Sequence, residues 1–299
     1  MFGKNRSDET SAKISLIVSM LIFGTIGVFR RYIPLSSTLI ALVRGLIGTL
    51  FLLCVLKIKK QKISYKAFAK NSIYLILSGI FIGFNWILLF EAYNNTSVSI
   101  ATLCYYMAPV VVIVLSPIFL KEKNGIKEWL SVIASVVGMI FISGVLNGSE
   151  NGSFNPKGIL FGLSAAVLYA LVVLCNKKMT DISPYDKTIF QLALATIVLV
   201  PYTLFTESVS VNSVDMKTLI LLLFVGVVHT GFTYYLYFGS MLNLSAQSIA
   251  LYSYIDPICA IILSALFLKE NFGINELIGT FLILGSTIIR EISFSAAKK

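Results

Sequence analysis

Four residues of this 299-residue chain carry charged or titratable side chains inside long apolar stretches: Arg44, Glu91, His229 and Asp256. Burying such groups away from water is costly, so each is a candidate for ionic binding or proton transfer. Asp256 directly precedes Pro257 and could bind a cationic group or carry a coupled proton. A structural ion pair between Asp256 and Arg44 is the alternative, and the sequence alone leaves both open.

The other three groups also have competing interpretations. His229 could titrate near neutral pH, although a histidine that is simply hydrogen-bonded to a neighbour is the favoured interpretation. Glu91 is predicted near the end of a helix, where it either lines a binding-site mouth or extends toward water. For Arg44 a structural or electrostatic role is favoured over substrate contact. Asp256, His229 and Glu91 are therefore the candidates for proton coupling.

Aromatic side chains gather in the same apolar stretches. Amphipathic rings around a cavity suit flat solutes or quaternary amines through stacking and cation–π contact. The alternative for any one tyrosine is a packing contact with a satisfied hydroxyl. The predicted substrate-binding residues are Asn85, Trp86, Tyr105, Tyr106, Tyr169, Tyr234, Tyr252, Tyr254 and Asp256.

Two prolines, Pro109 and Pro257, fall inside predicted helices. Proline has no backbone N–H, so each removes one helical hydrogen bond and frees a carbonyl. We expect a pair of kinked helices that line the site and flex, with a plain packing kink as the alternative. Together with these two prolines, Arg44 is predicted to have a structural role.

The composition decides which kind of element must position these residues. Hydrophobic residues make up 57% of the chain and charged residues 13%, and the mean hydropathy is +0.87. These values lie outside the range of water-soluble domains and exclude a soluble enzyme, a disordered chain and a disulfide scaffold. The apolar residues form ten blocks, each about long enough for a helix to cross the roughly 30 Å of a bilayer core.

The ten predicted spans run over about 14–33, 35–56, 71–93, 96–119, 127–146, 158–176, 186–206, 217–241, 244–268 and 275–292. With the N-terminus in the cytoplasm, 18 of the 24 lysines and arginines fall on the cytoplasmic side and 5 on the other, with Arg44 within a span. This bias predicts a multi-pass protein of the cell membrane with both termini in the cytoplasm. The lysines at 57–70 are interpreted as a retention signal that touches anionic lipid, and not as a nucleic-acid site.

The second half of the chain repeats the first. Residues 90–128 align with 238–276 at a shift of 148, which pairs Tyr106 with Tyr254 and Pro109 with Pro257. Asp256 aligns with Ala108, so its charge belongs to one half only. Ten spans in two copies give five per copy, and an odd number inverts the second copy in the membrane. Inverted repeats are typical of secondary transporters that bind substrate where the halves meet.

Several motifs extend this likeness: Phe119-Leu120-Lys121-Glu122 and Phe267-Leu268-Lys269-Glu270 after the two prolines, Arg44-Gly45, and Thr96-Ser97-Val98-Ser99. With them, the chain resembles EamA-type carriers of the drug/metabolite transporter superfamily over essentially its whole length. The resemblance implies ten helices, with the first, third, fourth, sixth, eighth and ninth around a central cavity. It also implies movement of small organic solutes such as amino acids or toxic cations, often outward and without ATP.

The fold prediction is an all-α polytopic membrane protein whose ten helices form two inverted five-helix repeats around a central cavity. We expect a cytoplasmic tail at 1–13, the first repeat at 14–146, an outer linker at 147–157, the second repeat at 158–292 and a cytoplasmic tail at 293–299. The predicted function is secondary-active transport of an amino acid, amine or related metabolite by alternating access, as an exporter, with proton coupling as an option. A facilitative uptake carrier or a channel-like pore is the alternative.

A multi-span membrane enzyme is disfavoured, since the chain has no Asp-rich motif, no paired metal ligands and no Gly-x-Ser-x-Gly. We expect no metal and no cofactor, and the sequence has no Walker motif for ATP. The expected partners are a small solute and membrane lipid, without nucleic acid. Ala134 and Gly138 are small residues one helical turn apart, and they suggest a homodimer contact on the fifth span.

Overall fold

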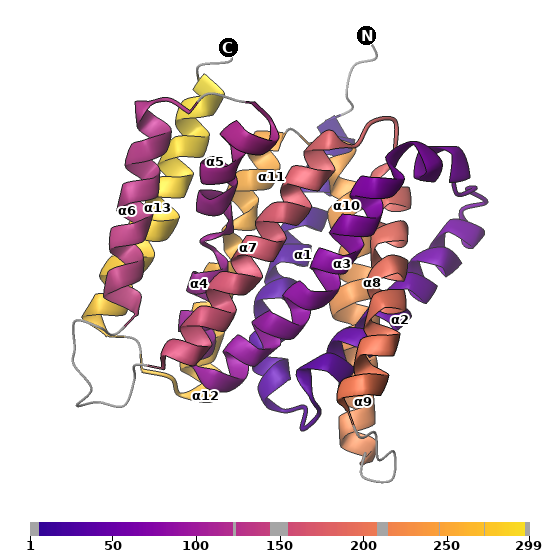
Figure 1. The fold of residues 1–299 in the computed structure, drawn as a ribbon, viewed down its shortest axis with the longest axis horizontal. Coiled ribbons are helices and arrows are strands. Elements are labelled where there is room, and N and C mark those ends of the chain that lie inside the picture. The colour runs from indigo at the N-terminus through magenta and orange to yellow at the C-terminus, as the bar shows by residue number, and fades with distance from the viewer. Residues whose placement is uncertain are drawn as a thin grey trace.

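All the regular structure in the described residues is helical. The computed structural model describes residues 6–121, 124–143, 155–207, 215–244, 246–271 and 273–296. Its elements are α1 (Arg6–Arg31), α2 (Ser37–Ile58), α3 (Tyr65–Asn95), α4 (Val98–Tyr105), α5 (Ala108–Phe119), α6 (Ile126–Ile142), α7 (Pro156–Lys178), α8 (Pro184–Thr206), α9 (Met216–Phe224), the π-helix η4 (Val225–Phe232), α10 (Thr233–Met241), α11 (Ala246–Ser253), α12 (Ile255–Leu268) and α13 (Ile274–Ala296) (Figure 1).

The helices extend into the predicted tails. α1 begins at Arg6 and α13 continues to Ala296, so parts of the segments predicted as tails at 1–13 and 293–299 are helical. The remainder of those tails, and the predicted linker at 147–157 except for its last three residues, lie outside the described residues.

Short polar residues fix where many of the helices begin. The side-chain oxygens of Ser36, Ser64 and Ser97 each accept a hydrogen bond from a backbone N–H in the first turn of α2, α3 and α4. Such caps stabilise a helix start by about 1 kcal/mol because they satisfy a donor that has no partner inside the helix. They allow one span to follow the previous one after a link of only a few residues.

The fold is that of a multi-pass membrane protein. Eight helical segments, counted over the described residues, are long and apolar enough to cross a bilayer. Three of them join elements named separately above: Val98–Phe119 (α4 and α5), Met216–Met241 (α9, η4 and α10) and Leu251–Leu268 (the end of α11 and α12). The helices α6 and α13 supply the remaining two of the ten helical passes predicted from the sequence. α6 has 17 residues, so it falls just short of the length expected for a span.

The fourth and ninth predicted spans are each broken near the middle. α4 ends at Tyr105 and α5 begins at Ala108, while α11 ends at Ser253 and α12 begins at Ile255. The two prolines lie in the first turn of the second half-helix, and not in the middle of one continuous helix as predicted. Proline is tolerated there because a first-turn N–H has no helical partner.

The two halves run in opposite directions through the bundle. α1 begins where α2 ends, since Asp8 and Lys59 line one pocket. α7, the first helix of the second half, begins at the opposite end, because a Cβ on Gly158 would lie 2.7 Å from the Thr96 Cβ. We name these two ends of the bundle the Lys59 end and the Arg31 end. The first helices of the halves are therefore antiparallel, as the inverted repeat requires.

Glycines let the central helices approach closely. A Cβ on Gly79 would lie 2.6 Å from the Leu194 Cβ, and one on Gly162 would lie 2.7 Å from the Cys104 Cβ, so neither position has room for a larger residue. These contacts bring α3 against α8 and α7 against α4. The Gly79–Gly83 and Gly158–Gly162 pairs, each one helical turn apart, therefore allow close helix packing.

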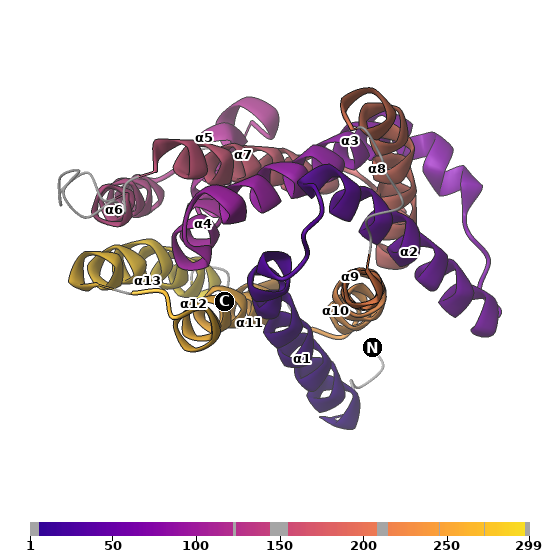
Figure 2. The same ribbon diagram turned by 90° about the horizontal axis from the view of Figure 1, so that it is seen from below.

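The helices α6 and α13 pack as a pair and form one edge of the molecule (Figures 1 and 2). Its two helices meet through glycines, since a Cβ on Gly138 would lie 2.8 Å from the Gly279 carbonyl oxygen. Gly138 therefore serves a contact within the chain. The Ala134–Gly138 pattern therefore no longer indicates a homodimer contact.

Candidate functional site

A carboxylate lies where the two broken spans meet. The Tyr106 hydroxyl, at the break between α4 and α5, donates to Asp256 Oδ2 at 2.8 Å and lies 3.2 Å from the Ser253 carbonyl oxygen. Asp256 is in the first turn of α12, two residues after the break at Tyr254. Sequence reasoning placed Asp256 in mid-helix, but it lies at the start of a half-helix, where the dipole favours negative charge.

This carboxylate lies at an intermediate depth in the bundle. A Cβ on Gly24 would be 2.8 Å from the Asp256 carbonyl oxygen. Gly24 precedes Arg31 by seven residues, which is roughly 10 Å of helix rise. Asp256 nevertheless remains partly exposed. A partly exposed side chain at this depth is expected where helices surround an internal space.

Tyrosines surround the carboxylate from both halves. The rings of Tyr105 and Tyr169 lie 5.4 Å apart, and those of Tyr105 and Tyr106 lie 6.1 Å apart. Tyr169 keeps 38% of its surface accessible. On α10, Tyr234 and Tyr237 lie 5.5 Å and 6.1 Å from the Phe23 ring. We call Asp256 with Tyr105, Tyr106, Tyr169, Tyr234 and Tyr237 the central cluster.

Arg44 is buried without an acidic partner in the part of the chain that the structure describes. Its guanidinium carbon lies 4.3 Å above the Trp86 ring centroid, and its Nε donates to Thr230 Oγ1 at 3.0 Å. The described residues therefore do not show the Arg44–Asp256 ion pair, which was one of the two interpretations of Asp256. Tyr93, Tyr105 and Tyr234 lie near the Arg44 guanidinium.

His229 is a packed residue of the π-helix η4. Its Nε2 lies 2.7 Å from Thr25 Oγ1, whose own proton is donated to the Ile22 carbonyl oxygen at 2.7 Å. The histidine must therefore donate from Nε2, which leaves Nδ1 as the acceptor. Nδ1 is buried and has no hydrogen-bond partner among the described residues. A second proton at Nδ1 would have no acceptor there, so this geometry favours the hydrogen-bonded interpretation of His229.

The remaining predicted residues lie outside the central cluster or beside it. Asn85 donates to the Ala165 carbonyl oxygen at 2.6 Å and so joins α3 to α7. Glu91 lies at the Arg31 end, where Asn94 donates to its side chain at 3.4 Å. Tyr252 packs with Leu16 and Met20 of α1. Tyr254 occupies the break between α11 and α12 and packs partly against the core.

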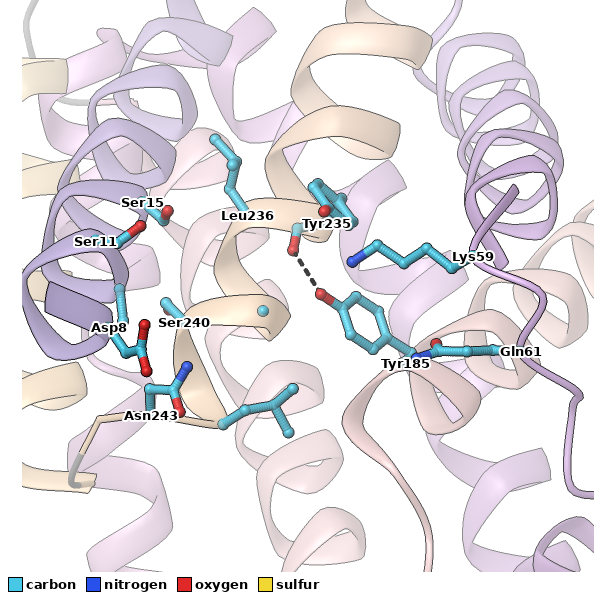
Figure 3. Close-up of a pocket in the computed structure, with 13 residues that line it drawn as sticks. Asp8, Ser11, Ser15, Lys59, Gln61, Tyr185, Tyr235, Leu236, Ser240 and Asn243 are labelled. Carbon is cyan, nitrogen blue, oxygen red and sulfur yellow. Dashed lines mark hydrogen bonds between the residues drawn. The ribbon is translucent and has the colours of Figure 1, made fainter. Parts of the chain in front are cut away.

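The Lys59 end contains a pocket of about 390 Å³ (Figure 3). Asp8 and Asn243 lie on one wall, and Lys59 and Tyr185 lie on the other. The Lys59 ammonium lies 4.8 Å from the Tyr235 ring centroid. Ser15 also lines the pocket and precedes Gly24 by nine residues, so the pocket ends roughly 13 Å along α1 from the level of Asp256.

At the Arg31 end, three helices are joined by hydrogen bonds. Glu270, which follows α12, accepts hydrogen bonds from the backbone N–H groups of Val98 and Ser99 at 2.8 Å and 3.3 Å. Arg31 donates to the Thr96 carbonyl oxygen at 2.6 Å and lies 3.6 Å from Glu270 Oε1. These contacts join α1, α4 and α12.

The comparison with known families gives the same architecture. A model described as "EamA-like transporter family" matches residues 10–144 and again residues 156–290. The chain belongs to the EamA-like transporter family. The two matches cover both halves, so the duplication predicted from the repeat is confirmed, and this family consists of transporters and not of enzymes.

Relatives of this EamA-like transporter match it over three quarters of its length or more. It is 32% identical to "Uncharacterized transporter YxxF" of Bacillus subtilis (strain 168), over 95% of this chain and 91% of the relative. It is 26% identical to "Protein RarD" of Salmonella typhi, over 76% of each chain. A solved structure titled "Crystal structure of protein" superposes with a TM-score of 0.66 at 16% identity, covering 97% and 99% of the two chains, and shows the shared fold.

Sequence reasoning missed several residues of this EamA-like transporter's site. Thr230 and Glu270 were not predicted as site residues, and their partners lie more than 170 residues away in the chain. The Lys-Glu motif after each proline was the available signal for Glu270, and it was used only to recognise the repeat. Tyr237 had the same aromatic signal as Tyr234. The described residues contain no group of three or more His, Cys, Asp or Glu side chains that could hold a metal.

Proposed function

We propose that this EamA-like transporter moves a small organic solute with an ammonium group by alternating access between the two halves. The observation that carries the proposal is the Asp256 carboxylate, held by Tyr106 of the other half at the meeting point of two broken helices. Half-helices that meet between inverted repeats can rock around a bound solute. The surrounding tyrosines provide cation–π contact for the ammonium and apolar surface for the rest of the solute.

The Arg44 guanidinium favours an amino acid over a simple amine as the transported solute. This guanidinium has no acidic partner in the described residues, and Tyr93 lies near both Arg44 and Asp256. A solute with a carboxylate and an ammonium would place one charge toward each of these two groups. An arginine without an acidic partner at membrane depth also marks a functional position in general.

The direction of transport follows from the proposed orientation. With the lysine-rich Lys59 end in the cytoplasm, the pocket of about 390 Å³ opens to the cytoplasm and the Arg31 end faces outward, joined by Glu270. This arrangement suits loading from the cytoplasm, and we propose export. Proton coupling would run through Asp256, which would exchange a proton for the solute's ammonium.

The test is transport by purified protein in proteoliposomes, with and without a pH gradient. The screen includes amino acids, the amines obtained by removing their carboxyl groups, polyamines and quaternary amines. We expect saturable flux for at least one amino acid, and at least a tenfold loss in Asp256→Asn, since a hydrogen bond to a charged group contributes about 1.5–3 kcal/mol. Asp215→Asn is the control, because Asp215 caps α9 at the surface and asparagine caps equally well.

Three outcomes would contradict parts of this proposal. Unchanged flux in Asp256→Asn would remove the central cluster from the mechanism. Flux that rises linearly with solute concentration would indicate a channel-like pore. Transport that ignores the pH gradient in both the parent protein and Asp256→Asn would show a facilitative carrier.

A further inference from the structure

We propose that Glu270, held by Arg31, is a latch that keeps the Arg31 end closed while the pocket at the Lys59 end is open. The proposal rests on the alternating-access function proposed above and names the group that closes one side. It is carried by the contacts that Glu270 makes with α4, a helix of the other half, and by the contacts of Arg31 with Thr96 and Glu270.

The first contact is with the start of α4. The first residues of a helix have backbone N–H groups without helical partners. In α4 the Ser97 side chain accepts from the N–H of Ile100 at 3.1 Å. The N–H groups of Val98 and Ser99 are bound instead by the two carboxylate oxygens of Glu270. The second half of the chain therefore completes the cap of a helix in the first half.

A carboxylate at this position is favoured by charge as well as by hydrogen bonding. The N-terminal end of a helix carries a partial positive charge, and a carboxylate that accepts backbone N–H bonds there makes strong, charge-assisted contacts. The Glu270 side chain is 14% exposed, so water screens these contacts little. Release of Glu270 would leave two backbone donors unpaired, and this gives the closed arrangement a definite free-energy advantage.

Arg31 joins α1 to the same point. Its guanidinium binds the Thr96 carbonyl oxygen just before α4 and lies within ion-pair distance of Glu270. The side chain of Ser99, whose N–H binds Glu270, also contacts α12, since its Oγ lies 2.6 Å from Ser264 Oγ. The contacts between α4 and α12 therefore continue beneath the latch, and opening this end requires them to separate together.

The local backbone directs Glu270 toward α4. Lys269, the preceding residue, adopts a left-handed conformation with φ of 53°. This conformation is uncommon for a residue with a side chain and costs roughly 1–2 kcal/mol. The Glu270 N–H binds the Ser264 carbonyl oxygen at 3.3 Å, so the chain folds back over the end of α12. The turn places the carboxylate over α4, and the Lys-Glu motif acquires a structural explanation.

The experiment measures the opening of the Arg31 end as a distance between two spin labels. One label is at Lys157→Cys on α7 and the other at Phe267→Cys on α12. Both are introduced into a variant whose four cysteines are replaced by alanine. Lys157 is next to Gly158, which packs on Thr96, so this pair reports the separation of α4 from α12. In Glu270→Gln we expect the distance distribution to gain a longer component. Glu128→Gln is the matched control, because Glu128 binds the N–H of Gly125 within its own turn.

Hydrogen exchange of the peptide around Val98 and Ser99 provides a second readout, and faster exchange is expected in Glu270→Gln. The combined Arg31→Glu and Glu270→Arg exchange separates a latch from a plain ion pair. An ion pair would be restored by the exchange, whereas an arginine at a helix N-terminus would not restore the cap.

The latch is refuted if folded Glu270→Gln gives the parent's distance distribution and exchange rate. If Glu270→Gln does not fold, Arg31→Gln and Ser99→Ala in the same labelled protein decide the matter by the same criterion. These measurements need no solute. Absent transport in the liposome test would therefore refute the proposed function while leaving the measurement of the latch intact.

Discussion

The chemistry of the central cluster depends on a single phenol proton. Tyr106 has one hydroxyl hydrogen and two acceptors within reach, the Asp256 carboxylate at 2.8 Å and the Ser253 carbonyl oxygen at 3.2 Å. When a solute's ammonium occupies the carboxylate, the hydroxyl can turn to the carbonyl without losing a hydrogen bond. In the proposed mechanism, Tyr106 therefore positions Asp256, and Asp256 would contact the solute.

Removal of this hydroxyl should weaken solute binding more than removal of its counterpart. In Tyr106→Phe the carboxylate loses a hydrogen bond from the other half, so we expect KM for the transported solute to rise about tenfold, which corresponds to roughly 1.4 kcal/mol. Tyr254→Phe, the repeat-related change, should have a smaller effect, since Asp256 accepts from Tyr106. Proteoliposome flux against concentration measures both, and equal effects would contradict the assigned role.

Part of the site was predictable from residue types alone. A carboxylate beside a proline within an apolar stretch, and tyrosines at matching places in two repeats, are visible in the sequence because membrane segments rarely carry such groups. The partners were not visible. Thr25 beside His229, and Thr230 beside Arg44, depend on how helices distant in the chain are packed. No spacing in the sequence encodes that packing.

At the scale of the helix, Pro257 explains the free carbonyl at the break. If α11 and α12 were one continuous helix, a residue other than proline at 257 would donate its N–H to the carbonyl of residue 253, four positions earlier. Proline has no N–H, and the Ser253 carbonyl oxygen lies instead 3.2 Å from the Tyr106 hydroxyl. The sequence predicted a freed carbonyl correctly, but it could not show that a tyrosine from the other half would occupy it.

Restoring the missing donor should stabilise the helix and impair transport. In Pro257→Ala the new N–H would compete with Tyr106 for Ser253, and the break between α11 and α12 would become more helical. We expect Tm to stay the same or rise, while kcat for flux falls severalfold. Pro201→Ala is the control, since Pro201 lies on an exposed face of α8, away from the breaks. An unchanged kcat in Pro257→Ala would show that the proline has a packing role only.

At the scale of the whole molecule, the inverted repeat explains why basic residues occur at both ends. Arg31 lies at the end of the bundle that has fewer lysines and arginines. It binds the Thr96 carbonyl oxygen and Glu270 there, and these contacts account for a basic residue at that end. At the Lys59 end Lys70 pairs with Asp181 and holds the pKa of that carboxyl below its ordinary value. The fold and its duplication could be predicted because hydropathy and repetition are properties of the whole chain.

The orientation of the molecule can be tested with two matched cysteine variants. Tyr32 and Tyr65 are 51% and 74% exposed and lie at opposite ends of the bundle. In a cysteine-free variant expressed in intact cells, Tyr32→Cys should react with a membrane-impermeant maleimide. Tyr65→Cys should react only after the membrane is opened. The reverse pattern would place the Lys59 end outside and change the proposed export into import.

The cap that Glu270 provides for α4 has a consequence for synthesis at the ribosome. Val98 and Ser99 are translated about 170 residues before the carboxylate that binds them. Until that carboxylate arrives, two amides at the start of α4 have no partner from the finished fold, so the first half inserts with its fourth helix incompletely anchored. We therefore expect the nascent chain to reach its final arrangement only after the ninth span has entered the membrane. The two halves then complete their folding together.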